Sequence, residues 1–310
     1  MSTVTPQLNL TPEELASLEA KTSIAGRAAI NARKRLTSPW ASFAAVVLAV
    51  LWTIPTFGLL VTSFRPELAI KTTGWWTFFT NPEVTLQNYE TVLSTEGSAG
   101  LGAYMINSFV IVIPAVIIPI CLAILAAYAF AWIDFRGRNV LFVAVFALQI
   151  VPIQVTLIPL LTLFVDAGIP GFWRIWLSHS TFALPLAIFL LHNFMKEIPK
   201  ELIEAARVDG AGHVKILFRV LLPLMTPALA AFGIFQFLWV WNDLLVALTF
   251  AGDGSVFPIT VGLANLSGTR DNAWQLLSAG AFVSIIIPVA VFIGLQRYFV
   301  RGLLAGGLKG

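Results

Sequence analysis

The sequence predicts an all-α polytopic membrane protein with six transmembrane helices. Of its 310 residues, 58% are hydrophobic and only 11% are charged, and the mean hydropathy is +0.85. Six long windows contain no Asp, Glu, Lys or Arg, and the basic residues gather in alternate connections between them. A chain this apolar does not have the composition of a soluble globular domain.

Each of the six windows is longer than the roughly twenty residues that a bilayer-spanning helix needs. Trimmed at their polar ends, they predict six transmembrane helices within 36–64, 97–133, 139–165, 175–195, 220–242 and 272–296.

The basic residues predict the orientation, because Lys and Arg accumulate on the cytoplasmic side of a membrane protein. With the N-terminus in the cytoplasm, the inner segments hold fifteen of the 19 basic residues and the outer segments hold four, namely Arg65, Lys71, Arg174 and Arg270. Both termini are therefore expected in the cytoplasm.

The N-terminal segment 1–39 is polar and basic. Thr11 and Pro12 fit a helix start, which allows either an amphipathic cytoplasmic helix or a solvated tail. We expect no cleavable signal peptide, because the first apolar run begins late and is about as long as a full span. The first outer segment is rich in aromatic residues such as Trp75 and Trp76, for which a membrane-interface belt is the favoured interpretation and an external partner the alternative.

Residue types needed for catalysis or metal binding do not cluster. Cys121 is the single cysteine, and His179, His192 and His213 show no metal-ligand spacing, so no metal site is expected. No Gly-Lys is followed by Ser or Thr, so the chain lacks a phosphate-loop pattern. We therefore expect no enzyme activity and no cofactor bound by this chain.

The most densely charged run between two apolar segments extends from Pro199 to Pro227 and predicts a helix, a break and a second helix. Pro199 suits a helix start, Glu204 is an available anion, and Gly210 after Asp209 suits a left-handed helix end. The prolines that follow restrict the backbone, so the first helix is expected to lie across the membrane direction.

This run resembles the EAA loop of binding-protein-dependent ABC importer permeases. The pattern is Glu-Ala-Ala, three residues, Gly, nine residues, an aliphatic residue, one residue and Leu-Pro. It is filled in full, with Val where Ile is usual, by Glu204, Ala205, Ala206, Gly210, Val220, Leu222 and Pro223. The resemblance implies a coupling helix that docks in a groove of the ATP-binding subunit. Asp209 is included among the residues of this coupling site. The alternative is an ordinary interfacial helix between two spans.

Polar side chains inside or at the ends of spans are costly and need a reason. The candidates for a substrate pathway are Asn107, Gln149, Gln154, Trp241, Asn242 and Asp243. A carboxylate, amides and an indole suit the hydroxyl groups and ring faces of a sugar. Hydrogen bonding to neighbouring helices is the alternative for all six.

The C-terminal tail, through Arg301, Gly306, Gly307 and Lys309, resembles that of MalG-type permeases, which reaches into the ATPase dimer interface. A disordered end is the alternative for this tail. The two motifs together imply the type I ABC importer permease fold and a carbohydrate substrate. The stretch Thr73-Gly74-Trp75-Trp76 and the cluster Trp241-Asn242-Asp243 look most like the maltose and α-glucoside branch. The implied partners are a second, MalF-like permease, an ATP-binding subunit dimer carrying ATP and Mg, and an extracytoplasmic solute-binding protein, at the bacterial inner membrane.

The resulting domain prediction is a cytoplasmic extension at 1–39, a permease domain at 40–300 with the EAA loop at 196–226, and a cytoplasmic tail at 301–310. A secondary transporter is a less favoured alternative, since the paired intramembrane charges typical of such proteins are missing. A polytopic membrane enzyme is also disfavoured, because no catalytic cluster assembles.

Overall fold

The computed structural model describes residues 39–95, 100–267 and 273–307. The chain divides into two units, residues 1–59 and 60–310, which are described separately. The N-terminal extension predicted at 1–39 lies outside the described residues apart from Pro39, which begins helix α2. This helix, Pro39–Ser63, has 25 residues, is apolar along its whole length and is long enough to cross a membrane.

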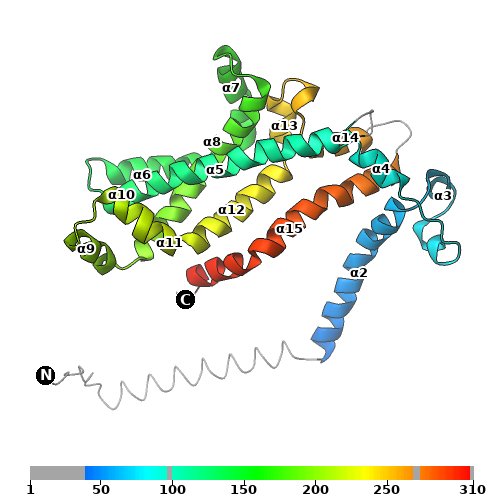
Figure 1. Ribbon diagram of the computed structural model, residues 1–310, viewed down its shortest axis with the longest axis horizontal. Coiled ribbons are helices and arrows are strands. Elements are labelled where there is room, and N and C mark those ends of the chain that lie inside the picture. The colour runs from blue at the N-terminus through cyan, green and yellow to red at the C-terminus, as the bar shows by residue number, and fades with distance from the viewer. Residues whose placement is uncertain (1–38, 96–99, 268–272, 308–310) are drawn as a thin grey trace. The chain divides into compact units, whose positions relative to one another are not determined.

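Four helices build the bundle of the 60–310 unit (Figure 1): α5 (Gly102–Trp132), α8 (Gly171–Glu197), α12 (Thr226–Trp241) and α15 (Trp274–Gly307). Helix α5 packs along α8, and α12 packs against α5, α8 and α15. All four are strongly apolar, so they bury one side against each other and leave apolar side chains outward for lipid or a partner.

Two of the six predicted spans are bent. The third consists of α6 (Arg138–Ala147), η2 (Leu148–Ile150) and α7 (Ile153–Asp166), with a bend of 104°. Pro152 explains this break, because it disfavours the helical conformation at Val151, whose ψ is 120°.

The fifth span bends by 73° at Met225, between the helices His213–Leu224 and Thr226–Trp241. Pro223 and Pro227 flank this bend, and neither can donate the backbone hydrogen bond of a continuous helix. With each bent pair counted as one span, α2, α5, α8 and α15 complete the six that the sequence predicts.

The connections carry short helices. Residues 64–101 contain α3 (Glu67–Thr72), η1 (Trp75–Phe79) and α4 (Gln87–Leu93), and residues 242–273 contain α13 (Leu245–Phe250), η4 (Gly254–Val256) and α14 (Ile259–Ser267).

In the first connection Arg65 is only 3% exposed, and its guanidinium donates to the carbonyl oxygen of Ala69 at 3.1 Å and to the Thr77 hydroxyl at 3.2 Å. These bonds compensate for the burial of its charge.

The core has two clusters. One joins the ends of α5, α8 and α12 to the EAA loop through Leu191, Met195, Ile203, Leu221 and Met225. The other surrounds Leu101, Ile175, Trp241 and Phe250 and packs α13 and α14 onto the bundle. The EAA loop therefore rests on the same core as three of the bundle helices.

Gly171 at the start of α8 provides a test of this packing. A Cβ at this position would overlap the backbone carbonyl oxygen of Ala251, whereas a Cβ at Gly294 in α15 would meet open space. We predict that Gly171→Ala lowers the melting temperature of the purified chain, at a cost of about 1–3 kcal/mol. Gly294→Ala is the matched control and should leave the melting temperature unchanged or raise it, because Ala is the better helix former. Equal melting temperatures for the two variants would contradict the packing of α8 on α13.

Candidate functional site

The Glu-Ala-Ala segment forms α9 (Lys200–Val208), which begins after Pro199 and ends at Asp209. Gly210 follows with φ of 76°, a conformation that L residues rarely adopt. The Gly210 N–H donates to the Arg207 carbonyl at 3.0 Å and the Ala211 N–H donates to the Ala206 carbonyl at 2.9 Å. These two bonds form a Schellman motif, so the left-handed helix end predicted at Gly210 is confirmed.

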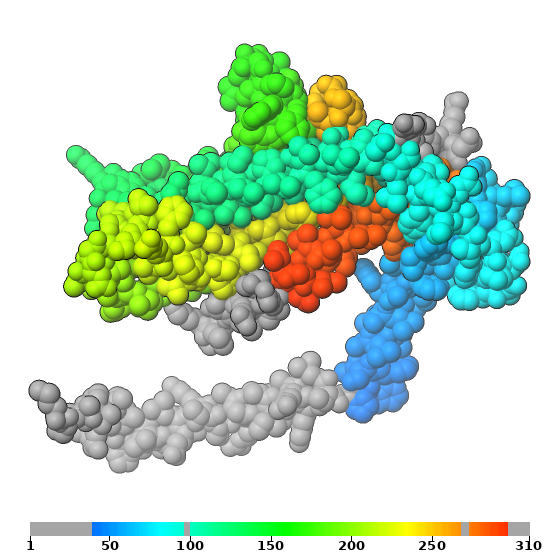
Figure 2. Space-filling model, in the orientation of Figure 1, coloured from blue at the N-terminus to red at the C-terminus, as the bar shows by residue number. Residues whose placement is uncertain are grey.

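Helix α9 has two unlike faces. Ile203 is 1% exposed and packs into the core, with Ala206 partly buried beside it. Glu204 and Ala205 are exposed, and Val208 is 88% exposed. One face therefore anchors the helix, and the other presents an anion, a small side chain and an apolar side chain. Helix α9 lies at one end of the unit (Figures 1 and 2).

The second part of the EAA loop is tied to α5. It comprises α10 (His213–Ile216), the π-helical turn η3 (Leu217–Leu221) and α11 (Leu222–Leu224). Nδ1 of His213 lies 2.7 Å from the Tyr128 hydroxyl. Pro223 cannot donate to the carbonyl of Arg219, which favours the wider π turn that precedes it.

An open cavity of about 750 Å³ adjoins α10 and η3. Its lining combines exposed apolar and basic side chains, from Gly212, His213, Val214, Lys215, Phe218 and Arg219. Sequence reasoning singled out none of these for a site. The signal available in the sequence was the occurrence of the apolar residues Val214 and Phe218 within a charged segment. Both side chains are exposed in the structure.

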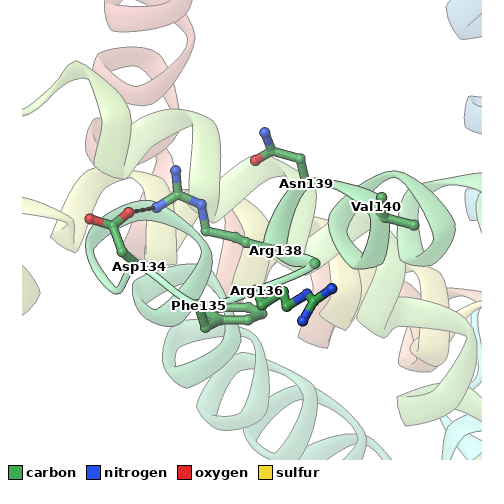
Figure 3. A pocket seen from close by; sticks show the side chains of 7 residues that line it. Asp134, Phe135, Arg136, Arg138, Asn139 and Val140 are labelled. Carbon is green, nitrogen blue, oxygen red and sulfur yellow. Dashed lines mark hydrogen bonds and ion pairs between the residues drawn. The ribbon is translucent and has the colours of Figure 1, made fainter.

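The turn between α5 and α6 surrounds a second open pocket of about 540 Å³ (Figure 3). Nη1 of Arg138 lies 2.7 Å from Oδ1 of Asp134, whereas the Arg136 side chain points away from this pair. The Asp134 side chain is almost fully exposed, so the ion pair contributes little stability. All seven lining residues belong to 134–140, so the pocket reflects the shape of one turn rather than a site shared by several elements.

Three of the predicted pathway residues lie together at the end of α12, in different environments. Trp241 is 1% exposed, and its indole N–H donates to the Ser284 carbonyl at 3.2 Å. Asn242 is exposed and donates to the Leu238 carbonyl at 2.7 Å. Oδ2 of Asp243 accepts from the Ala247 N–H at 3.1 Å in the first turn of α13. Asn242 is thus the one of these three whose side chain is exposed.

The other three candidates occupy separate places. Gln149 and Gln154 are exposed on either side of the bend at Pro152. Gln149 lines an apolar groove of about 550 Å³, together with Thr156, Thr181 and Pro185.

Asn107 is partly buried in α5 and donates to the carbonyls of Ser255 and Phe257 at 2.9 and 3.1 Å. It therefore holds the η4 turn. In that turn, hydrogen bonds from the hydroxyl and the N–H of Ser255 lower the pKa of the Asp253 carboxyl.

His179 is a buried polar group. The sequence predicted no functional role for it. It is 1% exposed, its Nε2 lies 3.6 Å from Oδ2 of Asp243, and its Nδ1 has no hydrogen-bond partner in the described structure. Its place inside an apolar window was the available signal, since polar residues within spans are costly. Within 39–95, 100–267 and 273–307, no three His, Cys, Asp or Glu residues are placed to hold a metal ion.

The predicted tail begins as a continuation of α15, which extends to Gly307 and so includes Arg301, Gly306 and Gly307. Lys309 lies outside the described residues.

Comparison with known proteins supports the predicted fold and family. Residues 119–304 match the family model of the binding-protein-dependent transport system inner membrane component. The osmoprotective compounds uptake permease protein GgtD of Synechocystis is 50% identical over 90% of this chain and 96% of its own length. The α-glucoside transport system permease protein AglG of Rhizobium meliloti is 49% identical over 76% of this chain and 63% of its own length.

More distant similarity extends the comparison. The trehalose/maltose transport system permease protein MalG of Thermococcus litoralis is 31% identical over 86% of this chain and 95% of its own length. A chain of a bacterial ABC transporter involved in alginate import has the same fold, with a TM-score of 0.66, 22% identity and coverage of 84% of this chain and 98% of its own. The chain therefore belongs to the family of binding-protein-dependent transport system inner membrane components.

Proposed function

We propose that this chain is one of two membrane permease subunits of an ATP-driven importer for a carbohydrate, and that it receives the ATP-driven movement through the EAA loop. The observation that carries the proposal is α9, whose buried Ile203 fixes it to the core while Glu204, Ala205 and Val208 remain exposed. An anchored helix with an exposed small and apolar face suits docking in a groove of a partner.

The partner that fits this face is an ATP-binding subunit. The chain has no phosphate-loop pattern of its own, so ATP and Mg would be bound by that subunit. Glu204 would face a basic group on it, and Asp209, Gly210, Leu222 and Pro223 would shape the loop. The tail residues Arg301, Gly306, Gly307 and Lys309 would make a second contact with the ATPase dimer.

The distribution of basic residues supports the same topology. Fifteen of the 19 Lys and Arg lie in segments on the side of the EAA loop and four lie on the other side. We therefore place the loop and both termini in the cytoplasm of a bacterial cell, with the chain in the inner membrane. A solute-binding protein would approach the opposite face, where α3, η1, α13 and η4 belong.

The names of relatives support a proposal for the substrate class. AglG is named for α-glucosides, the Thermococcus protein for trehalose and maltose, and GgtD for osmoprotective compounds. We propose maltose or maltodextrin, trehalose or another α-glucoside, with a different sugar, a polyol or another osmoprotective compound as the alternative.

The proposed pathway residues would have two roles. Gln149, Gln154 and Asn242 are exposed and would offer amide groups to sugar hydroxyls. Asn107, Trp241 and Asp243 would support the pathway from inside the bundle, because their polar groups hold η4, α15 and α13. A second, MalF-like permease would supply the other half of the pathway.

The function can be tested on the assembled complex. The tagged chain is purified from its native membranes, reconstituted in vesicles, and assayed for ATP hydrolysis and sugar uptake with each candidate sugar and the solute-binding protein. We predict a complex containing a second permease and an ATP-binding subunit, whose ATPase activity is stimulated by one loaded binding protein. Transport by the chain alone, driven by an ion gradient without ATP, would instead support a secondary transporter.

Gly210 provides a sharper test of the EAA loop. Any L side chain at its positive φ is strained by roughly 1–2 kcal/mol, whereas Asn tolerates this conformation better. We predict that Gly210→Val loosens the end of α9 and lowers the sugar imported per ATP hydrolysed several-fold, while Gly210→Asn retains most of it. Both variants should assemble, because Gly210 is exposed with open space around it. An unchanged ratio in Gly210→Val would contradict a role of this helix end in coupling.

A further inference from the structure

Two buried carbonyl groups of the bundle lose their helical hydrogen-bond donor to a proline. Pro119 lies inside α5 and Pro288 lies inside α15. Since proline has no N–H, the carbonyl four residues earlier lacks its usual partner in each helix. These carbonyls belong to Ala115 and Ser284, which are 0% and 8% exposed.

Side chains of α12 reach both carbonyls. Nε2 of Gln236 donates to the Ala115 carbonyl at 3.1 Å, and Nε1 of Trp241 donates to the Ser284 carbonyl at 3.2 Å. The two donors are themselves buried, with exposed fractions of 3% and 1%. In a membrane no water replaces such partners, so the two bonds satisfy groups that would otherwise be costly to bury.

The spacing of the two donors explains how one helix serves two neighbours. Five residues along an α-helix correspond to a rotation of about 140° and a rise of about 7.5 Å. Gln236 and Trp241 therefore point to different sides of α12, which lies between α5 and α15 in Figure 1 and packs against both.

Only some of the helix prolines free a carbonyl that receives a side-chain hydrogen bond from another helix. Apart from Pro39, Pro223 and Pro227, which lie in the first turn of their helices, six prolines lie inside described helices: Pro55, Pro114, Pro119, Pro159, Pro185 and Pro288. Among the described hydrogen bonds, Pro119 and Pro288 are the two whose freed carbonyl receives a side-chain bond from another helix. Both bonds come from α12, the helix that continues directly from the EAA loop through the buried Met225.

We propose that Gln236 and Trp241 are positioning residues that fix α5 and α15 to α12 at their prolines, so that a displacement received by the EAA loop moves the three helices together. The bonds lie where each neighbouring helix lacks one of its own hydrogen bonds and is most easily bent. Without them, α12 would move while α5 and α15 followed incompletely. This inference rests on the proposed ATP-driven import.

The test is a double-mutant cycle in the reconstituted complex, with ATP hydrolysed per sugar imported as the readout. Gln236→Met keeps the length of the side chain and removes its amide. We expect it to raise the ATP used per sugar about threefold, which corresponds to about 0.6 kcal/mol, a typical value for a hydrogen bond between membrane helices.

Rescue distinguishes positioning from simple loss of packing. Pro119→Ala returns a backbone N–H to the Ala115 carbonyl, so Gln236→Met should have little effect in that background. Pro288→Ala is the matched control, because it leaves the Ala115 carbonyl unchanged and should give no rescue. The reverse holds for Trp241→Phe, which Pro288→Ala should rescue and Pro119→Ala should not. This second pair supplies a result even if Pro119→Ala assembles poorly.

Three outcomes would overturn the proposal. Gln236→Met and Trp241→Phe could lower the melting temperature without changing the ATP used per sugar, which would show a purely structural role. The penalties could persist in the rescuing backgrounds, or both proline variants could rescue both donors equally. Failure of the proposed function is distinct, since the unaltered complex would then show no ATP-dependent uptake at all.

Discussion

Inside a membrane every backbone N–H and carbonyl group must find its partner within the protein, and this constraint shapes the permease bundle. Each proline inside a span removes one such partner. Where the freed carbonyl lies between helices, as at Ala115 and Ser284, a side chain of α12 supplies the missing bond. The prolines thus make α5 and α15 dependent on α12, because one backbone carbonyl in each helix is satisfied by a side chain of α12.

The EAA loop differs from the bundle, where polar groups are satisfied within the protein. Under the proposed function it holds its shape while one face stays available for a partner. Ile203 inserts into the core, the Schellman bonds close α9, and the bond between Tyr128 and His213 ties α10 to α5. The exposed face of α9 carries a small, an apolar and an anionic side chain, and exposed basic side chains follow on α10 and η3. A rigid loop with a free face, continuous in sequence with α12, suits the transfer of movement into the bundle.

The apolar windows predicted the fold class and the six spans, because uncharged apolar runs of twenty residues or more are typical of helices that cross a membrane. Gly210 likewise indicated a helix end that the backbone conformation confirms. The bends at Pro152 and Met225 were harder, because a proline marks a break without giving its angle. The partners of Trp241, Asn107 and His179 were not predictable, since a polar side chain in a span does not reveal which neighbouring helix it meets. The sequence therefore indicated polar sites in the spans without distinguishing exposed amides from those that hold helices together.

Site-specific crosslinking would show directly whether α9 contacts an ATP-binding subunit. Cys121 is exposed and is first replaced by Ser, after which a thiol is introduced by Val208→Cys on α9 or by Val84→Cys, a position 62% exposed between η1 and α4. A short thiol-to-amine crosslinker is applied to membranes containing the whole complex. We predict an adduct between the chain and the ATP-binding subunit from Val208→Cys and none from Val84→Cys. An adduct with that subunit from Val84→Cys alone would contradict a contact between α9 and the ATP-binding subunit.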